Sequence, residues 1–144
     1  MSMAVCDLDD LLASLQAERN PGVYVYCALP AGVDAPDVPA LGVFREQEGV
    51  TAILEEADAA ERGLTVAFRA AWITLRVYSD LHAVGLTAAV AAALASEGIS
   101  CNVVAALHHD HLFVPVNRAD DALAALERLQ AEARGRAAPR RAAR

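Results

Sequence analysis

The residues best placed for chemistry lie where a predicted strand leads into a predicted helix. Residues 74–79 read TLRVYS, which is typical of a strand, and DLHAVGLTAAVAAALASEG follows, with Val84-Gly85-Leu86-Thr87 where the helix opens. The first amides of a helix have no acceptor inside it, and together with the helix dipole they favour a carboxylate or a phosphate. Because no catalytic constellation competes for this position, the residues predict a small-molecule sensor.

Side chains that could act in catalysis give weaker signals. Cys101 with His108 or His111 is the only candidate pair of nucleophile and base, but a strand position buries a thiol among apolar neighbours, where cysteine is usually inert. Ser79 lacks a GxSxG context, and neither GxGxxG nor GxxxxGK[ST] occurs. We therefore predict a protein that is not an enzyme and needs no cofactor.

The run His108-His109-Asp110-His111 raises the question of a metal. His109 and His111 alternate around Asp110 and could share one face of a strand. Zinc, however, requires three or four converging ligands, and no cysteine or HxxxH pair is suitably spaced. Asp110 is a natural turn residue. The run is therefore predicted to be a metal-free turn between two strands.

The elements that would position these residues follow from the apolar spacing. The first half predicts a helix capped by Asp7 and broken at Asn20-Pro21-Gly22, then three strands around a loop, then a short helix. The strands are expected over 23–29, 42–47 and 50–54, the loop over 31–40, and the helix over 57–62. Residues 47–50 would close a tight hairpin between the second and third strands.

The second half carries the clearer pattern. Residues 66–78 alternate, with Trp72 and Thr74 on one face and Ile73 and Leu75 on the other. Trp72 is interpreted as an anchor between the two halves, with ligand stacking as the alternative. The expected elements that follow are a helix over 86–97 closed by Gly98, strands over 101–107 and 112–116, and a last helix capped by Asn117.

Two similar blocks emerge from this order of elements. Each resembles a split βαβ unit of the ferredoxin-like kind, the first one permuted. The predicted fold class is α+β, with two units in tandem, antiparallel sheets and helices on one face. We place the first domain at residues 1–64, the second at 65–133 and a disordered tail at 134–144. Units of this size are expected to pair through sheet edges, within the chain or across a homodimer.

Composition and charge narrow the function classes. Of the 144 residues 56% are apolar, yet no charge-free run of 18 apolar residues predicts a membrane span. All 19 acidic residues precede the tail, which holds five of the 12 arginines. An acidic body disfavours nucleic acid, so we predict neither a nucleic-acid nor a membrane partner. Cys6, Cys27 and Cys101 lack motif spacing and predict reduced thiols in the cytoplasm.

Four strings together resemble one known family. AVGLTAAVAAALASEGISCNVVA, HDHLFVP, NPGVYVYCALPAG and REQEGVTAIL are similar to small bacterial proteins built from two tandem ACT-like domains, related to the regulatory domains of aspartate kinases. The resemblance covers about residues 8–130. It implies ACT-type βαββαβ units that bind amino acids at the interfaces between them.

The resemblance also implies where a ligand would lie. One side would be formed by the end of the first strand and the helix opening: Ser79, Asp80, Val84, Gly85, Leu86 and Thr87. The other would be the start of the second strand: Ile99, Ser100, Cys101 and Asn102. The helix amides would bind the carboxylate of the ligand. Its ammonium would be bound by Asp80 or by backbone carbonyls near Ser100. We predict an amino-acid-sensing regulatory module, with a purely structural or interaction module that has no retained ligand site as the alternative.

Overall fold

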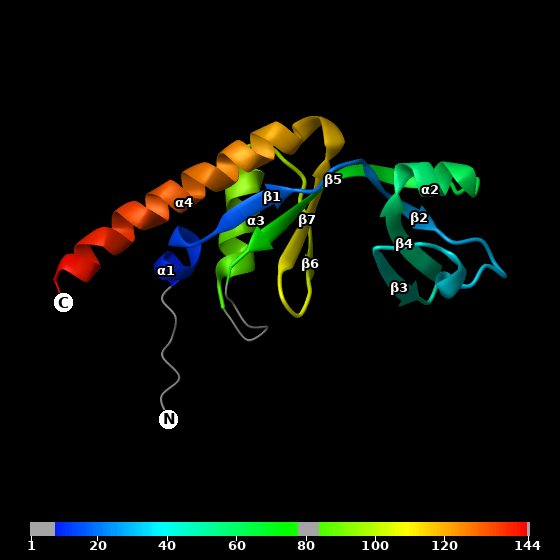
Figure 1. The fold of residues 1–144 in the computed structure, drawn as a ribbon, viewed down its shortest axis with the longest axis horizontal. Helices are drawn as coiled ribbons and strands as arrows, with labels where there is room; N and C mark the ends of the chain where they lie inside the picture. The colour runs from blue at the N-terminus through cyan, green and yellow to red at the C-terminus, as the bar shows by residue number, and fades with distance from the viewer. Residues whose placement is uncertain (1–7, 78–83, 144) are drawn as a thin grey trace, which may run out of the picture.

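The computed structural model describes residues 8–77 and 84–143 as one curled antiparallel sheet with helices on one face (Figure 1). The elements follow the chain in the order α1 (Leu8–Ala13), β1 (Gln16–Arg19), β2 (Tyr24–Ala28), a 3-10 turn (Ala35–Asp37), β3 (Gly42–Glu46), β4 (Gly49–Glu55), α2 (Glu56–Glu61), β5 (Val66–Arg76), α3 (Leu86–Ser96), β6 (Asn102–Ala105), β7 (Asp110–Pro115), a second 3-10 turn (Val116–Arg118) and α4 (Ala119–Ala142).

The long strand β5 runs through both halves of the sheet. Its first half pairs with β2, from Cys27 opposite Val66 to Tyr24 opposite Ala70. Its second half pairs with β1 along that same edge and with β7 along the other. The chain therefore builds an N-terminal unit with strand order β3-β4-β2-β5 and a C-terminal unit with order β1-β5-β7-β6. The predicted boundary at residue 64 lies just before this shared strand.

The fourth strand of the C-terminal unit is β1, from the other end of the sequence. Gln16 lies opposite Arg76 and Arg19 opposite Ile73. The sequence predicted a helix through these residues, and that prediction is wrong. The helix stops after Ala13, and the chain that follows uses an edge of β5 that would otherwise expose unpaired backbone groups. In space α1 and β1 thus belong with the C-terminal unit, although they lie within residues 1–64.

The C-terminal unit holds the larger core. Alternate residues of β5, including Ile73 and Leu75, face helices α1, α3 and α4, as the alternating pattern predicted. Leu11 and Leu12 of α1, and Leu15 just after it, are buried in the same core. At about 25 cal/mol per Å² of apolar area removed from water, it is the main source of stability. Its fully buried members include Leu12, Leu15, Ile73, Leu75, Val90, Leu94, Leu112, Val114 and Leu126.

The N-terminal unit is smaller and lacks one helix. Its strands β2 and β4 bury Val25, Cys27 and Leu54 under α2, on the same face of the sheet that α3 and α4 cover in the other unit. The link between β2 and β3 is a loop containing one 3-10 turn, where the prolines predicted a loop. The hairpin of β3 and β4, with Glu46 opposite Gly49, is confirmed. The observed α+β fold with helices on one face is the predicted one.

The last helix is much longer than the sequence indicated. It runs to Ala142, so the expectation of a disordered tail over residues 134–144 is wrong as far as residue 142. Ala133 is buried in the core that includes α1, and Ala137 is buried one turn further along the helix. Arg134 Nε donates to the carbonyl of Ala13 at 3.1 Å, and Arg136 Nε lies 2.9 Å from Asp9 Oδ1. Alanines four residues apart share one helix face, and here that face has a partner.

The start of this helix also differs from the prediction. Asn117 was expected to cap it, but residues 116–118 form a 3-10 turn and the N-cap is Arg118. Arg118 contacts Asp121 in the first turn, with Nε 2.9 Å from Oδ2. Asp120 and Asp121 lie in the first turn, near the positive end of the helix dipole. Among the described helices, even the 24-residue α4 lacks the apolar stretch that would span a bilayer.

Candidate functional site

Helix α3 opens from a glycine in the left-handed conformation. Gly85 has φ 97° and ψ −19°, a conformation that disfavours a side chain. A Cβ there would also lie 3.1 Å from Cδ2 of Leu8. The carbonyl of Gly85 accepts the first helical bond, from the amide of Ala89 at 2.9 Å. The three amides between them have no acceptor in the helix, and glycine has no side chain to cap them.

The residues around this opening divide into buried and exposed ones. Leu86 is 3% exposed and anchors the helix in the core, whereas Thr87 is exposed and Val84 is 88% exposed. Ser79 and Asp80, predicted for the same site, lie outside the described residues. The opening therefore presents amides and an exposed hydroxyl side chain above a fixed apolar base.

The second predicted group lies at the other end of α3. Ile99 is buried, and its amide donates to the carbonyl of Leu94 at 3.0 Å. Ser100 and Asn102 are exposed, and Asn102 Nδ2 donates to the carbonyl of Phe113 at 3.5 Å. Ten residues of α-helix rise about 15 Å, so within one chain a small ligand cannot touch both predicted groups. The fold does not bring them together.

Cys101 does not have the environment of a nucleophile. Burial raises the pKa of its thiol to about 11, so the thiol stays protonated at neutral pH. Cys101 and Cys27 are both free, and burial also raises the pKa of Cys27. The register places His111 opposite Val104, three residues further along β6 than Cys101. These facts argue against the thiol–imidazole chemistry that the sequence left open.

His111 instead joins a polar network on the helix-free face of the sheet. Trp72 Nε1 donates to His111 Nδ1 at 3.0 Å, and that nitrogen lies 3.4 Å from Thr74 Oγ1. Asn20 Nδ2 donates to Thr74 Oγ1 at 2.9 Å, and the backbone amide of Asn20 donates to the carbonyl of Trp72 at 2.9 Å. The network thus ties the bend between β1 and β2 to β5 and β7.

Burial lowers the pKa of His111; the neighbouring His109 lowers it further, and Asp110 opposes both. The pKa of Asp110 is raised by burial, against the influence of the two imidazoles. A neutral His111 suits its role, because Nδ1 must be unprotonated to accept the indole hydrogen. Within residues 8–77 and 84–143, no three His, Cys, Asp or Glu side chains are grouped so as to hold a metal ion.

Trp72 packs where the two units join. Its ring meets Tyr24 edge-on, with centroids 5.1 Å apart, and Tyr26 similarly contacts Phe68 and Phe113 at 5.7 and 5.6 Å. Such edge-to-face pairs contribute about 0.5–1.5 kcal/mol each beyond area burial. The anchoring interpretation of Trp72 therefore accounts for its position.

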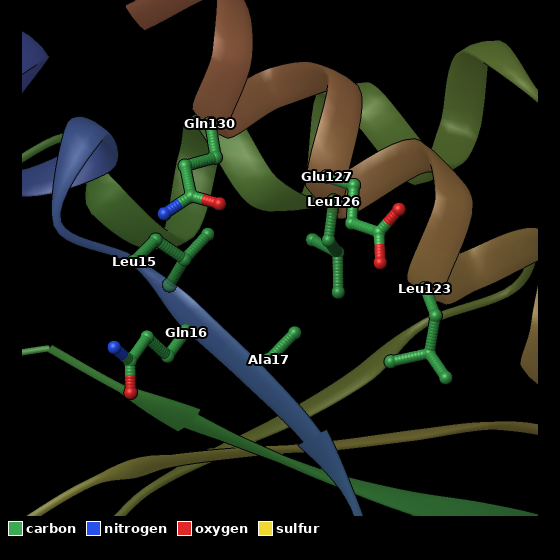
Figure 2. Close-up of a pocket in the computed structure, with 7 residues that line it drawn as sticks. All are labelled: Leu15, Gln16, Ala17, Leu123, Leu126, Glu127 and Gln130. Carbon is green, nitrogen blue, oxygen red and sulfur yellow. The ribbon is translucent and has the colours of Figure 1, made fainter. Parts of the chain in front are cut away.

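A pocket that the sequence did not predict lies between β1 and α4 (Figure 2). Its volume is about 220 Å³, and its lining combines apolar and polar side chains. The residues that form it are Leu15, Gln16, Ala17, Leu123, Leu126, Glu127 and Gln130. It could not be found from sequence because it exists only where β1 joins the C-terminal sheet.

Family models for the ACT domain match the chain twice, over residues 3–71 and over residues 68–128. The two matches meet inside β5, the strand that the two units share. No curated protein matches the chain at a significant level.

Several solved structures share the fold. A protein of unknown function from Vibrio cholerae, described as a possible transport protein, is 42% identical over 88% of this chain and 98% of that one, with a TM-score of 0.78. A protein from Agrobacterium tumefaciens is 18% identical over 81% of this chain and 89% of that one, with a TM-score of 0.64. The ligand-free regulatory subunit of aspartate kinase from Thermus thermophilus is 11% identical over 78% of this chain and 95% of that one, with a TM-score of 0.57. The last two likenesses concern the fold alone.

Proposed function

The chain belongs to the ACT-domain family, and on this premise we propose that it is a non-catalytic regulatory module that senses a small α-amino acid in the cytoplasm. The family supports a regulatory ligand-binding module in general terms. The observation that carries the more specific proposal is the left-handed, uncapped glycine at the start of α3. It leaves helix amides free for an anion at the point where an ACT unit would receive one.

In this proposal the helix opening holds the carboxylate of the amino acid. The amides that follow Gly85 donate to it, and the exposed Thr87 lies beside it. Asp80, or the backbone of residues 99–102, accepts from the ammonium. The buried Leu86 fixes the opening in place, because moving it would expose core surface.

The 15 Å separation suggests that two copies form one site. Strand β6 pairs only with β7, so its outer edge is free within the described chain. If two copies join β6 to β6 antiparallel, the start of one strand lies beside the end of the other. Ala105, at the end of β6, lies opposite Asp110, which also faces the end of β5 at Leu75. That end of the sheet leads into α3, so residues 99–102 of one copy would approach the other copy's helix opening.

The test is calorimetric titration of the full chain with each of the common amino acids, followed by two variants. Thr87→Asp places a carboxylate beside the proposed ligand carboxylate and should abolish binding. Thr87→Asn is the matched control without charge and should retain it. Both should fold, since Thr87 is exposed and an acidic residue suits the first turn of a helix. Asp80→Ala should weaken binding by about 1.5–3 kcal/mol if this side chain holds the ammonium.

Two results would contradict the proposal. One is the absence of any amino acid that binds more tightly than millimolar, and the other is unchanged binding by Thr87→Asp. Either would favour the alternative of a structural or interaction module with no retained ligand site.

A further inference from the structure

The pocket between β1 and α4 is lined by four apolar side chains, two side-chain amides and one carboxylate (Figure 2). Leu15 and Leu126 are 2% and 1% exposed, so the apolar part of the lining is held in place by the core. The carboxylate belongs to Glu127, which is exposed. Among the described residues that line the pocket there is no lysine, arginine or histidine. An anionic ligand would therefore meet only a like charge, whereas a cation would be attracted.

The polar groups of α4 reach the pocket because of their spacing along the helix. Leu123, Glu127 and Gln130 follow one another at intervals of four and three residues, which places them on one face of α4. Two acidic side chains in the first turn of the same helix, Asp120 and Asp121, each have an arginine partner. No ion pair within the described chain neutralises Glu127 in this way, so its charge is available to a ligand.

Two further hydrogen-bond acceptors border the same pocket. Gln130 Nε2 donates to the carbonyl of Ala13 at 3.2 Å, which fixes the side-chain amide and leaves its oxygen Oε1 to accept from another group. The second acceptor is on β1, where the backbone amide of Asn20 donates to β5. Backbone groups alternate in direction along a strand, so the carbonyl of Ala17, three residues earlier, points away from β5. Because β1 pairs only with β5, that carbonyl has no strand partner in the described chain.

We propose that this pocket binds a small primary ammonium compound with a short apolar chain. The ammonium group donates to the Glu127 carboxylate and to Gln130 Oε1, with the Ala17 carbonyl as the acceptor for its third hydrogen. The apolar chain lies against Leu15 and Leu126. At roughly 30 Å³ for each water-sized group in a liquid, the pocket accommodates about seven non-hydrogen atoms, which favours a short amine over a peptide.

This ligand class differs from the one proposed for the opening of α3. An α-amino acid would bring its own carboxylate close to that of Glu127, and no cationic side chain in the lining compensates for it. The pocket also combines residues from the two ends of the described chain, because β1 supplies one wall and α4 the other. A ligand that binds only this assembled wall stabilises the native fold.

The first test follows the backbone amides of the full chain by two-dimensional NMR during titration with isopentylamine at neutral pH. Isopentanol, which has the same shape without the charge, is the matched control compound. The amine should shift the amides of residues 15–17 and 123–130 with a low-millimolar or tighter dissociation constant, and the alcohol should bind at least 10-fold more weakly. The absence of saturable shifts in these segments, or equal affinities for the two compounds, would overturn the proposal.

The second test removes the charge that the proposal depends on. Glu127→Gln should weaken amine binding at least 10-fold, whereas Glu132→Gln, the same change at an exposed position of α4 outside the pocket, should leave it unchanged. Both variants should fold, because the two positions are exposed and glutamine is a good helix former. Unchanged affinity in Glu127→Gln would overturn the proposal. Equal losses in both variants would overturn it too, since they would indicate general attraction to an acidic protein.

The same titration separates this proposal from the amino-acid site. Thr87→Asp, which should abolish amino-acid binding at the α3 opening, should keep the wild-type affinity for isopentylamine. Loss of amine binding in this variant would place the amine at the α3 opening and overturn the proposal. A chain that binds no amino acid but binds the amine through Glu127 would contradict only the proposed function.

Discussion

At the scale of single residues, Gly85 and His111 matter because of what surrounds each of them. Gly85 needs a backbone conformation that other residues avoid, at the opening of α3, where no side chain caps the first helix amides. His111 needs to be neutral, because the indole of Trp72 donates to its ring nitrogen. Both requirements can be tested by replacing one residue.

Gly85→Ala should destabilise the protein by about 1–2 kcal/mol, since it forces a side chain into the left-handed region and towards Leu8. Gly135→Ala is the matched control. Gly135 lies inside α4, has no neighbour that a Cβ would meet and no positive φ, so alanine should stabilise by about 0.5–1 kcal/mol. Denaturant unfolding measures both. Equal effects of the two substitutions would show that the α3 opening has no special backbone requirement.

The stability of the fold should decrease as pH falls below the ordinary pKa of histidine, about 6.5. The pKa of His111 is lowered in the folded state by burial. As pH falls, the unfolded chain therefore takes up the proton first, and this protonation stabilises the unfolded state relative to the folded one. The loss continues until pH passes below the folded pKa. His111→Gln should reduce this acid sensitivity, whereas His108→Gln should not. The fluorescence of Trp72, the only tryptophan, reports unfolding in each variant, and identical pH profiles would contradict the prediction.

At the scale of elements, two segments take their structure from partners far away in sequence. Strand β1 exists because β5 offers it an edge. From Gln130 onward α4 packs on α1, with the side chains of Gln130 and Arg134 both bonded to the carbonyl of Ala13. The first and last helices of the described chain are thereby joined (Figure 1).

Truncation after Ala133 should lower the melting temperature by roughly 3–6 °C, or about 1–2 kcal/mol for a chain of this size. It removes the buried Ala137 and the contacts of Arg134 and Arg136 with α1. Truncation after Ala142 removes only the last two residues and should leave the melting temperature unchanged. Scanning calorimetry on both chains decides the matter. An unchanged midpoint for the shorter chain would mean that the helix end does not dock.

At the scale of the whole molecule, the two ACT units are connected in two ways. They share β5, and the N-terminal segment of the chain packs into the C-terminal unit. Neither unit corresponds to a continuous half of the sequence, because α1 and β1 complete the C-terminal unit. Ligand binding at one unit could therefore affect the other through a shared strand and the aromatic contacts beside it. This connection is a physical route for a regulatory signal.

A fragment comprising residues 65–144 should not fold cooperatively, although it contains the whole second family match. It lacks the fourth strand of its sheet and the buried Leu11, Leu12 and Leu15, and each deleted buried leucine represents several kcal/mol. The chain from residue 8 to 144 is the control and should melt as one unit. A dispersed amide spectrum and a cooperative transition for the fragment would contradict this prediction.

The sequence by itself determined the parts of this protein whose signal is local. Alternation along residues 66–77 revealed which side of β5 is buried, glycine at 85 and 98 bounded α3, and prolines predicted the loop after β2. Combined strings identified the family. Tertiary structure decided the rest. The segment QAER has no strand pattern and becomes a strand only because β5 has an open edge, and the alanines of the last helix stabilise it only where α1 covers them. The two halves of the predicted ligand site lie at opposite ends of one helix, because residues that precede and follow a helix are separated by its length.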